Sequence, residues 1–593
     1  MNRNLNRRDF LKATGLGAAS LAYPACTTAA RQRKGRRRKQ PNVVLVMTDD
    51  QGYGDLACHG NPVIQTPNLD RLHAQSVRLT DFHVDPTCSP TRSALMTGRY
   101  SSRTGVWHTI MGRSLLHKDE VTIADVFSAG GYRTGVFGKW HLGDNHPFRP
   151  QDRGFGEVLI HGGGGVGQGP DYWGNDYFDD TYRQNGKLKA FKGYCTDVFF
   201  DNAMKFIEAN KDRPFFCYLP TNAPHGPYNV AEKYSKPYRD KGVEARQANF
   251  YGMITNIDEN MGRLLRHLRR LDLQRNTILI FMTDNGTSGG YSAGMRGKKG
   301  SEYDGGHRVP CFIRWPRGGL KGGRDIDRLA AHIDVLPTLI ELCGLKKPQA
   351  VKLDGTSLVP LLSGEAADWP DRTLLVHSQR IEHPEKWRKS AVMTDRYRLV
   401  NGKELYDMKV DPGQKNDIAE DNPEVVEKLR ESYEDSWASI SERFDGYCEI
   451  IIGSDEENPC RLMSHDWHSP RPAWSQGAVR SGSKANGFWA VHVARDGMYE
   501  FALRRWPVEV DRPINAAIPG GKAISATNAR LKIAPVSAFA ESTGVDVSKP
   551  ISKDAHAVTF KVQLKAGKTR LQTWFTDDEG TSRGAYYVYV KRL

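Results

Sequence analysis

The 593-residue sequence has few cysteines and no hydrophobic run long enough to cross a bilayer. Its nine cysteines form no C-x-x-C pair and no zinc-type spacing, which argues against a zinc-binding module. Cys217 and Cys311 lie in apolar runs typical of core positions, whereas Cys448 and Cys460 are close enough in sequence to pair in an oxidising compartment. The apolar stretch 13–25 is shorter than the roughly 20 residues that a membrane-spanning helix needs, and no later segment is a transmembrane candidate.

Positive charge is sparse outside the N-terminus, although the formal net charge is +15. Residues 1–40 hold eleven Lys and Arg and one Asp, a net +10, which leaves +5 for the other residues. The basic tract Arg31–Lys39 contains almost no apolar residues, so we interpret it as a solvated linker; a patch for a polyanion or a membrane surface is the alternative. This distribution predicts no nucleic-acid partner.

The N-terminal residues have the features of an export signal. Asn6–Lys12 resembles a twin-arginine signal, and a short apolar stretch follows it. We therefore expect a periplasmic or extracellular protein that uses the twin-arginine export machinery. Cys26 is a candidate lipidation site, although the residues before it fit a lipobox poorly.

Continuous apolar runs predict buried parallel strands at Val43–Met47, Phe215–Leu219 and Thr277–Met282. Helical patterns lie between them, notably around Ile254–Leu271, which indicates an α/β core with a mainly parallel sheet. The four-glycine run Gly162–Gly165 begins a segment that we interpret as a long surface loop able to shape the rim of a site.

The C-terminal part has a different pattern, with alternating runs such as Trp489–Val493 and Val558–Val562. This pattern predicts an all-β domain over residues 446–593. Its aromatic residues suit either a core or stacking on sugars, and we expect core positions for most of Trp467, Trp474, Trp489, Trp506 and Trp574.

Two pairs of oxygen-bearing side chains follow predicted buried strands. Asp49 and Asp50 come after the first strand, and Asp284 and Asn285 come after the Thr277–Met282 run. Sites in open α/β sheets form beyond the carboxyl ends of strands, so the two pairs are expected to converge. Carboxylate and amide oxygens select Ca²⁺ or Mg²⁺ rather than zinc.

The segment Thr87–Arg92 holds the most informative cysteine. Pro90 suits the first position of a helix, which places Cys88 at a helix N-terminus with Arg92 one turn along. The helix dipole and the nearby cation favour a thiolate, so this interpretation predicts an acidic, reactive thiol at position 88. The alternative is a small buried cysteine beside a helix cap, which an isolated C-x-P-x-R segment would favour.

Cys88-Ser89-Pro90-Thr91-Arg92 resembles the C-x-P-x-R signature of type I sulfatases, and Ser93–Arg99 continues the pattern. Further segments match that family in order, and the resemblance extends from about Asn42 to about Ile418. The matching segments are Gly138–Gly143, Ala223–Pro227 and Arg296–Gly306.

The resemblance implies an alkaline-phosphatase-like α/β core with a mainly parallel central sheet flanked by helices. A small C-terminal α+β subdomain with an antiparallel sheet and an extra all-β domain would follow it. We accordingly divide the chain into an export signal and basic linker (1–40), a sulfatase catalytic domain (41–368), a C-terminal subdomain (369–445) and an accessory β-rich domain (446–593).

The resemblance also implies chemistry. In the family a separate formylglycine-generating enzyme oxidises the cysteine, here Cys88, to Cα-formylglycine, and the metal is Ca²⁺ rather than Mg²⁺. The hydrated aldehyde attacks sulfur, and the alcohol then leaves. The implied metal ligands are Asp49, Asp50, position 88, Asp284 and Asn285.

The remaining implied roles belong to cationic and titratable groups. Arg92 polarises the hydrate, and Lys139 holds a sulfate or hydrate oxygen. His225 or Lys299 protonates the leaving alcohol and binds substrate, with Lys298 as the alternative match for Lys299. His141 or Asp284 serves as the base that releases sulfate.

These features favour an exported sulfuric-ester hydrolase acting on sulfated saccharides, with small aryl sulfates as the alternative substrates. A phosphodiesterase or phosphonate-ester hydrolase on the same scaffold is a competing interpretation. A catalytically idle polysaccharide-binding protein that works through its β domain is another.

Overall fold

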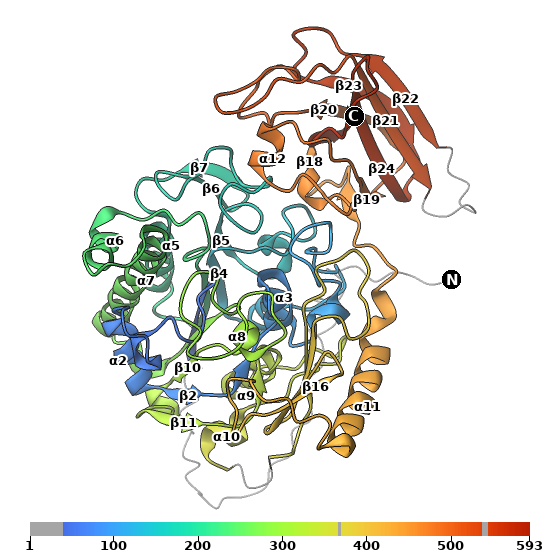
Figure 1. The fold of residues 1–593 in the computed structure, drawn as a ribbon. Helices are drawn as coiled ribbons and strands as arrows, with labels where there is room; N and C mark the ends of the chain where they lie inside the picture. The colour runs from blue at the N-terminus through green and yellow to red at the C-terminus, as the bar shows by residue number, and fades with distance from the viewer. Residues whose placement is uncertain (1–39, 366–368, 536–543) are drawn as a thin grey trace, which may run out of the picture. The chain divides into compact units, whose positions relative to one another are not determined.

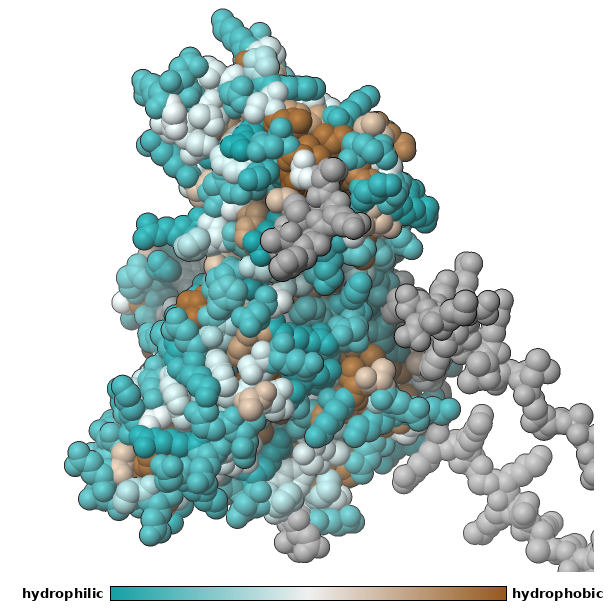
Figure 2. All heavy atoms as spheres, turned by 90° about the vertical axis from the view of Figure 1, so that its right-hand side faces the viewer, coloured by the Kyte–Doolittle hydropathy of each residue, from teal (hydrophilic) through white to brown (hydrophobic). Residues whose placement is uncertain are grey.

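The computed structural model describes residues 40–365, 369–535 and 544–593 (Figure 1). The twin-arginine-like motif, Cys26 and the basic tract lie outside the described residues. In the part of the chain that is described, no helix combines the length and apolar character needed to cross a membrane. The face seen in Figure 2 is mainly hydrophilic, with hydrophobic side chains gathered in small patches.

A ten-stranded sheet forms the centre of the larger α/β part. Its five middle strands, in the order β9-β1-β8-β4-β5, are parallel, and β10 pairs antiparallel with β9. The strands in sheet order are β11 (Arg324–Ile326), β2 (Val77–Leu79), β10 (Cys311–Arg314), β9 (Thr277–Thr283), β1 (Asn42–Thr48), β8 (Phe215–Pro220), β4 (Arg133–Gly138), β5 (Glu157–Ile160), β6 (Thr181–Gln184) and β7 (Lys187–Ala190). The predicted α/β class with a mainly parallel sheet is confirmed.

Helices cover both faces of this sheet. Alternate residues of β1 enter two separate cores, because successive side chains of a strand point to opposite faces. Val43 and Leu45 pack with α3, α4 and α9, whereas Val44 and Val46 pack with α2, α5 and α7. The helices of this part are α2 (Pro67–Gln75), α3 (Cys88–Thr97), α4 (Ile123–Ala129), α5 (Cys195–Ala209), α6 (Glu232–Arg239), α7 (Ala245–Arg270), α8 (Asp304–His307), α9 (Val335–Cys343) and α10 (Val359–Ser363).

A small antiparallel sheet follows in the order β13-β14-β15-β16, and α11 (Pro423–Ile440) packs against it. Its strands are β13 (Leu374–His377), β14 (Ser390–Met393), β15 (Tyr397–Val400) and β16 (Glu404–Asp407). A two-stranded piece, β3 (Phe82–His83) with β12 (Ala330–Ala331), lies outside the main sheet. This part has the expected α+β composition.

The C-terminal residues form two mainly antiparallel sheets around one core. The larger sheet contains β17 (Ile450–Ile452), β19 (Phe488–Val493), β24 (Gly567–Thr576), β21 (Asn528–Pro535), β22 (Val545–Pro550) and β25 (Ser582–Arg583). The smaller contains β18 (Cys460–Met463), β26 (Tyr587–Arg592), β20 (Gly497–Arg504) and β23 (Val558–Leu564), and α12 (Gln476–Arg480) is the short helix of this region. The all-β prediction is confirmed apart from that helix and the short 3-10 helix Ser464–Asp466.

The C-terminal core answers the question, left open by the sequence, of whether Cys448 and Cys460 pair. Cys448 and Cys460 are buried in it as free thiols and do not pair. Leu115 and Phe148, which belong to the α/β part, pack in the same core. The β sandwich is therefore joined to the α/β part by a shared hydrophobic cluster.

Candidate active site

The oxygen-bearing pairs predicted after two strands do converge. Asp49 and Asp50 follow β1, and Asp284 and Asn285 follow the neighbouring parallel strand β9. The ligand atoms of Asp49, Asp50, Asp284 and Cys88 all lie within 4.8 Å of one another, and these residues are buried. The Asp50 backbone N–H donates to Oδ1 of Asp284 over 3.0 Å, and Nδ2 of Asn285 donates to Oδ1 of Asp50 over 3.0 Å.

Cys88 lies at the start of α3, as predicted, but the helix begins at Cys88 itself rather than at Pro90. Its Sγ donates to Oδ1 of Asp49 over 3.2 Å and to Oδ1 of Asn285 over 3.4 Å. Burial, together with the Asp284 and Asp49 carboxylates, raises the pKa of the Cys88 thiol. The prediction of an acidic thiol is therefore wrong for the unmodified cysteine, because desolvation and negative neighbours outweigh the helix dipole.

Three cationic side chains surround this group. The buried Arg92 pairs with Oδ2 of Asp284 at 2.8 Å and donates to the Lys139 carbonyl oxygen at 2.9 Å. Nζ of the fully buried Lys139 lies 2.6 Å from Oδ2 of Asp49. Nζ of Lys299 lies 2.6 Å from Oδ1 of Asp50, whereas its neighbour Lys298 is exposed. Burial acts to lower the pKa of Lys299, but the Asp50 carboxylate outweighs it and holds the amine charged.

The two predicted histidines are both at the site. Nε2 of His225 lies 3.8 Å from Oδ2 of Asp50, and its Nδ1 lies 2.7 Å from the Gly226 carbonyl oxygen. Burial lowers the pKa of His225 to about 4. His141 uses Nε2 to contact the Thr109 carbonyl oxygen at 2.8 Å, and burial lowers its pKa well below the usual value. Both imidazoles are therefore neutral near pH 7 in the free protein.

The carboxylate cluster suits a hard divalent cation. Three buried carboxylates and the Asn285 amide supply oxygen donors, which Ca²⁺ and Mg²⁺ prefer. Burial and the adjacent Asp49 raise the pKa of Asp284 to about 6, as expected where like charges crowd together. A bound cation would relieve that repulsion, so the residues fit such an ion.

The glycine-rich segment is not the surface loop that the sequence suggested. Residues 162–166 are buried, and a Cβ at Gly164 would lie 2.1 Å from Cε1 of His141. Two residues of the β sandwich region form backbone hydrogen bonds with the end of this segment. The Gly169 N–H donates to the Trp474 carbonyl oxygen and the Gln476 N–H donates to the Gly167 carbonyl oxygen, both over 2.9 Å. Burial by residues about 300 positions away in sequence explains why composition misled the prediction.

Sequence reasoning missed three residues that border the site. Thr109 accepts the contact from His141, and the Tyr177 hydroxyl donates to the His225 carbonyl oxygen over 2.5 Å. His465, from the β sandwich region, lies with its ring centre 6.4 Å from that of His141. No local motif marks these residues, because each reaches the site through a long-range contact.

Family models and individual relatives both match this chain to sulfatases. A family model described as "Sulfatase" matches residues 41–345, and one described as "N-sulphoglucosamine sulphohydrolase, C-terminal" matches residues 298–438. The chain is 31% identical to human arylsulfatase A over 505 residues, which cover 73% of this chain and 95% of that protein. It is 30% identical to dog N-acetylgalactosamine-6-sulfatase, covering 61% of this chain and 70% of that protein.

A solved structure of Ps i-CgsB in complex with k-i-k-neocarrahexaose is also similar. The two share 26% sequence identity with a TM-score of 0.63, and the match covers 69% of this chain and 95% of that one. The similarity therefore extends through nearly the whole of that protein and leaves almost a third of this chain unmatched.

Proposed function

Because the chain belongs to the sulfatase family, we propose that it is a sulfuric-ester hydrolase that removes sulfate from sulfated glycans through a formylglycine made from Cys88. The observation that carries this proposal is the buried group of Asp49, Asp50, Cys88 and Asp284 with three cations against it. An anionic ester needs such positive charge where its leaving oxygen gains negative charge.

Position 88 is the nucleophile in this proposal. Because the chain matches the sulfatase family, we take the nucleophile to be the hydrate of the aldehyde that a formylglycine-generating enzyme would make from Cys88. Burial and the neighbouring carboxylates raise the pKa of the unmodified thiol, which makes the thiol itself a poor nucleophile. Asp49, Asp50, Asp284 and Asn285 would hold Ca²⁺, which supplies positive charge beside the reacting oxygens. Arg92 fixes the Asp284 carboxylate and favours its ionised form, since the two form a buried pair at 2.8 Å.

The charges of the lysines and histidines at the site suggest a different role for each. Lys139 and Lys299 face the carboxylates as cations and are placed to bind sulfate oxygens. His225 is neutral in the free protein, with Nδ1 held by the Gly226 carbonyl and Nε2 free to take a proton. We propose that the anionic ester raises the pKa of His225, so that the imidazolium then protonates the departing alcohol. His141 is the candidate base for sulfate release.

The proposal also names a substrate class. Ps i-CgsB binds a neocarrahexaose, and the relative from dog is named for an N-acetylgalactosamine sulfate, so sulfated saccharides are the substrates we favour over small aryl sulfates. The β sandwich region supports this choice, because it contributes His465 and the 44% exposed Trp474 next to the loops that border the site.

We further propose that the protein is exported. Asn6–Lys12 would direct it to the twin-arginine machinery, and lipidation at Cys26 is an additional hypothesis. Added protease tests this proposal in cells whose outer barrier has been removed. The parent should be digested, whereas a variant with Arg7 and Arg8 replaced by lysine should stay inside and be protected. Equal protection of the two proteins would contradict export by this signal.

The proposed activity is tested by a screen of defined sulfated saccharides for released sulfate, with Cys88→Ala as the blank. The protein is made together with a formylglycine-generating enzyme, and an aryl sulfate and an aryl phosphate are included. We expect sulfate release from at least one saccharide and none from the blank. A strong preference for the phosphate ester would favour the phosphodiesterase interpretation instead.

A further inference from the structure

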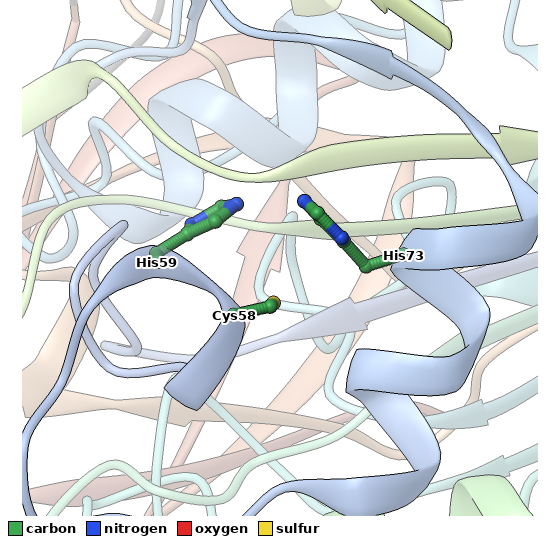
Figure 3. Close-up of side chains that lie close together, drawn as sticks. All are labelled: Cys58, His59 and His73. Atoms are coloured by element: carbon green, nitrogen blue, oxygen red, sulfur yellow. The ribbon is translucent and has the colours of Figure 1, made fainter. Parts of the chain in front are cut away.

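A second group of metal-ligating side chains lies apart from the carboxylate cluster. Cys58 and His59 lie in the 3-10 helix Ala57–His59, and His73 lies in the last turn of α2. Figure 3 shows the tips of the two imidazole rings turned toward each other with the thiol beneath them. One ligand atom from each residue lies within 4.8 Å of the other two. The spacing in sequence explains why no zinc pattern was visible, because Cys58 and His59 are adjacent and His73 follows fourteen positions after His59.

The surroundings orient these rings. Nδ1 of His59 lies 2.8 Å from the Tyr53 carbonyl oxygen, so Nδ1 carries the proton and Nε2 presents its lone pair. The His59 ring stacks on Tyr53 with centroids 3.9 Å apart, and Phe312 meets both imidazoles edge-on at 5.7 and 5.2 Å. Metal-binding histidines have such a carbonyl partner on the second nitrogen.

The three side chains line an open hollow of about 320 Å³. All three residues are partly exposed, so an ion can enter without unfolding. One thiol and two imidazoles are the ligands of zinc and other borderline-soft ions, in contrast to the oxygen donors at Asp49, Asp50 and Asp284. We propose that Cys58, His59 and His73 bind one Zn²⁺ ion, with water in the fourth position.

The distances are compatible with this proposal. Zinc bonds of about 2.0–2.3 Å place tetrahedral ligand atoms roughly 3.3–3.6 Å apart, so the three side chains need to close by about 1 Å. The Cys58 thiol loses its proton to solvent as sulfur binds the ion. Because the site has its own ligands and its own opening, this proposal does not rest on the proposed function.

Two arginines oppose the ion, since Arg308 and Arg78 both carry positive charge near His59. Nη1 of Arg78 lies 3.3 Å from Nδ1 of His73 and donates to it, and Arg78 also pairs with Asp325. When Nε2 of His73 binds metal, Nδ1 carries the proton and that contact is lost. Replacing Arg78 by glutamine removes the positive charge and supplies an amide oxygen that accepts from Nδ1, so Arg78→Gln is expected to strengthen binding.

The test uses the full chain carrying Cys88→Ala, with excess Ca²⁺ present to fill the oxygen-ligand site. Co²⁺ is titrated as a spectroscopic probe and then displaced by Zn²⁺. We expect one equivalent of Co²⁺ with a thiolate-to-cobalt charge-transfer band in the near ultraviolet. Adding Cys58→Ser should abolish the band, and His73→Ala should weaken Zn²⁺ binding by more than about a hundredfold, since losing even an outer partner costs 10–100-fold.

His556→Ala is the matched control, because that histidine lies in the β sandwich region, where it is exposed and pairs with Asp511. It should leave Zn²⁺ affinity unchanged, whereas Arg78→Gln should raise it by about tenfold. Circular dichroism confirms that each variant folds. A cobalt–thiolate band that persists with Cys58→Ser, or the lack of any such band in the parent, would overturn the proposal.

Discussion

Replacing Gly164 by alanine tests whether the buried glycine segment sets the position of His141. A Cβ at this position would lie 2.1 Å from Cε1 and 2.2 Å from Nε2 of the imidazole, whereas ordinary contacts begin near 3.4 Å. The ring or the loop must therefore move by more than 1 Å, which breaks the 2.8 Å contact between His141 and the Thr109 carbonyl. A displacement of about 1 Å costs on the order of 100-fold in rate.

The assay is kcat/KM for an aryl sulfate, measured with the thermal midpoint of each variant. Gly165→Ala is the graded comparison, because its Cβ would approach His225 only to 3.2 Å, so a smaller loss is expected. Gly477→Ala is the control, since the nearest atom to its Cβ would be 3.7 Å away. A Gly164→Ala enzyme within about twofold of the parent would refute the reasoning.

Four other predictions follow from the same contacts. Truncation after Gly446 should abolish turnover of small and polymeric esters alike, because the sandwich shares a core with Leu115 and Phe148; retained aryl sulfatase activity would contradict this. Arg92→Met should lower the free energy of unfolding by about 3–5 kcal/mol in urea titrations, since it breaks a buried ion pair, and a change below 1 kcal/mol would count against it. Burial lowers the pKa of His377 to about 4, so the unfolded chain binds a proton between pH 6.5 and 4 that the folded chain does not. The free energy of unfolding should therefore decrease as the pH is lowered from 6.5 to 4. His377→Gln should reduce this fall by roughly 3 kcal/mol, and parallel curves for the two proteins would disprove the assignment. Chelation should remove sulfatase activity and Ca²⁺ should restore it; full activity in chelator would exclude the proposed ion.

The sequence predicted the parts of the site that follow from strand geometry. The apolar runs at Val43–Met47 and Thr277–Met282 locate β1 and β9, and parallel strands end at one edge of a sheet. The convergence of Asp49 and Asp284 follows from that edge. Cys88 at a helix start was likewise predictable from local chemistry.

Two predictions failed because burial by distant segments decides them. The Cys88 thiol seemed acidic because only its helix and Arg92 were visible in sequence, whereas its pKa is set by desolvation and by carboxylates from other strands. The glycine run seemed exposed because its cover, Trp474 to Gln476, comes from a distant part of the chain. Long-range packing of this kind leaves no local pattern.

The β sandwich region also differs from a separable sugar-binding module. Trp467, Trp489 and Trp506 are buried in its core, as expected, and Trp474 is 44% exposed. Its segment from His465 to Gln476 contacts the loops that carry Thr109 and the buried glycines. We therefore regard this region as part of the scaffold of the site.

The most direct test of the central claim is ion-chromatographic measurement of sulfate released from a sulfated saccharide by the protein made with a formylglycine-generating enzyme. The account predicts continuous release over many turnovers, with none from Cys88→Ala prepared in the same way. Equal release by the two proteins would contradict a catalytic role for position 88.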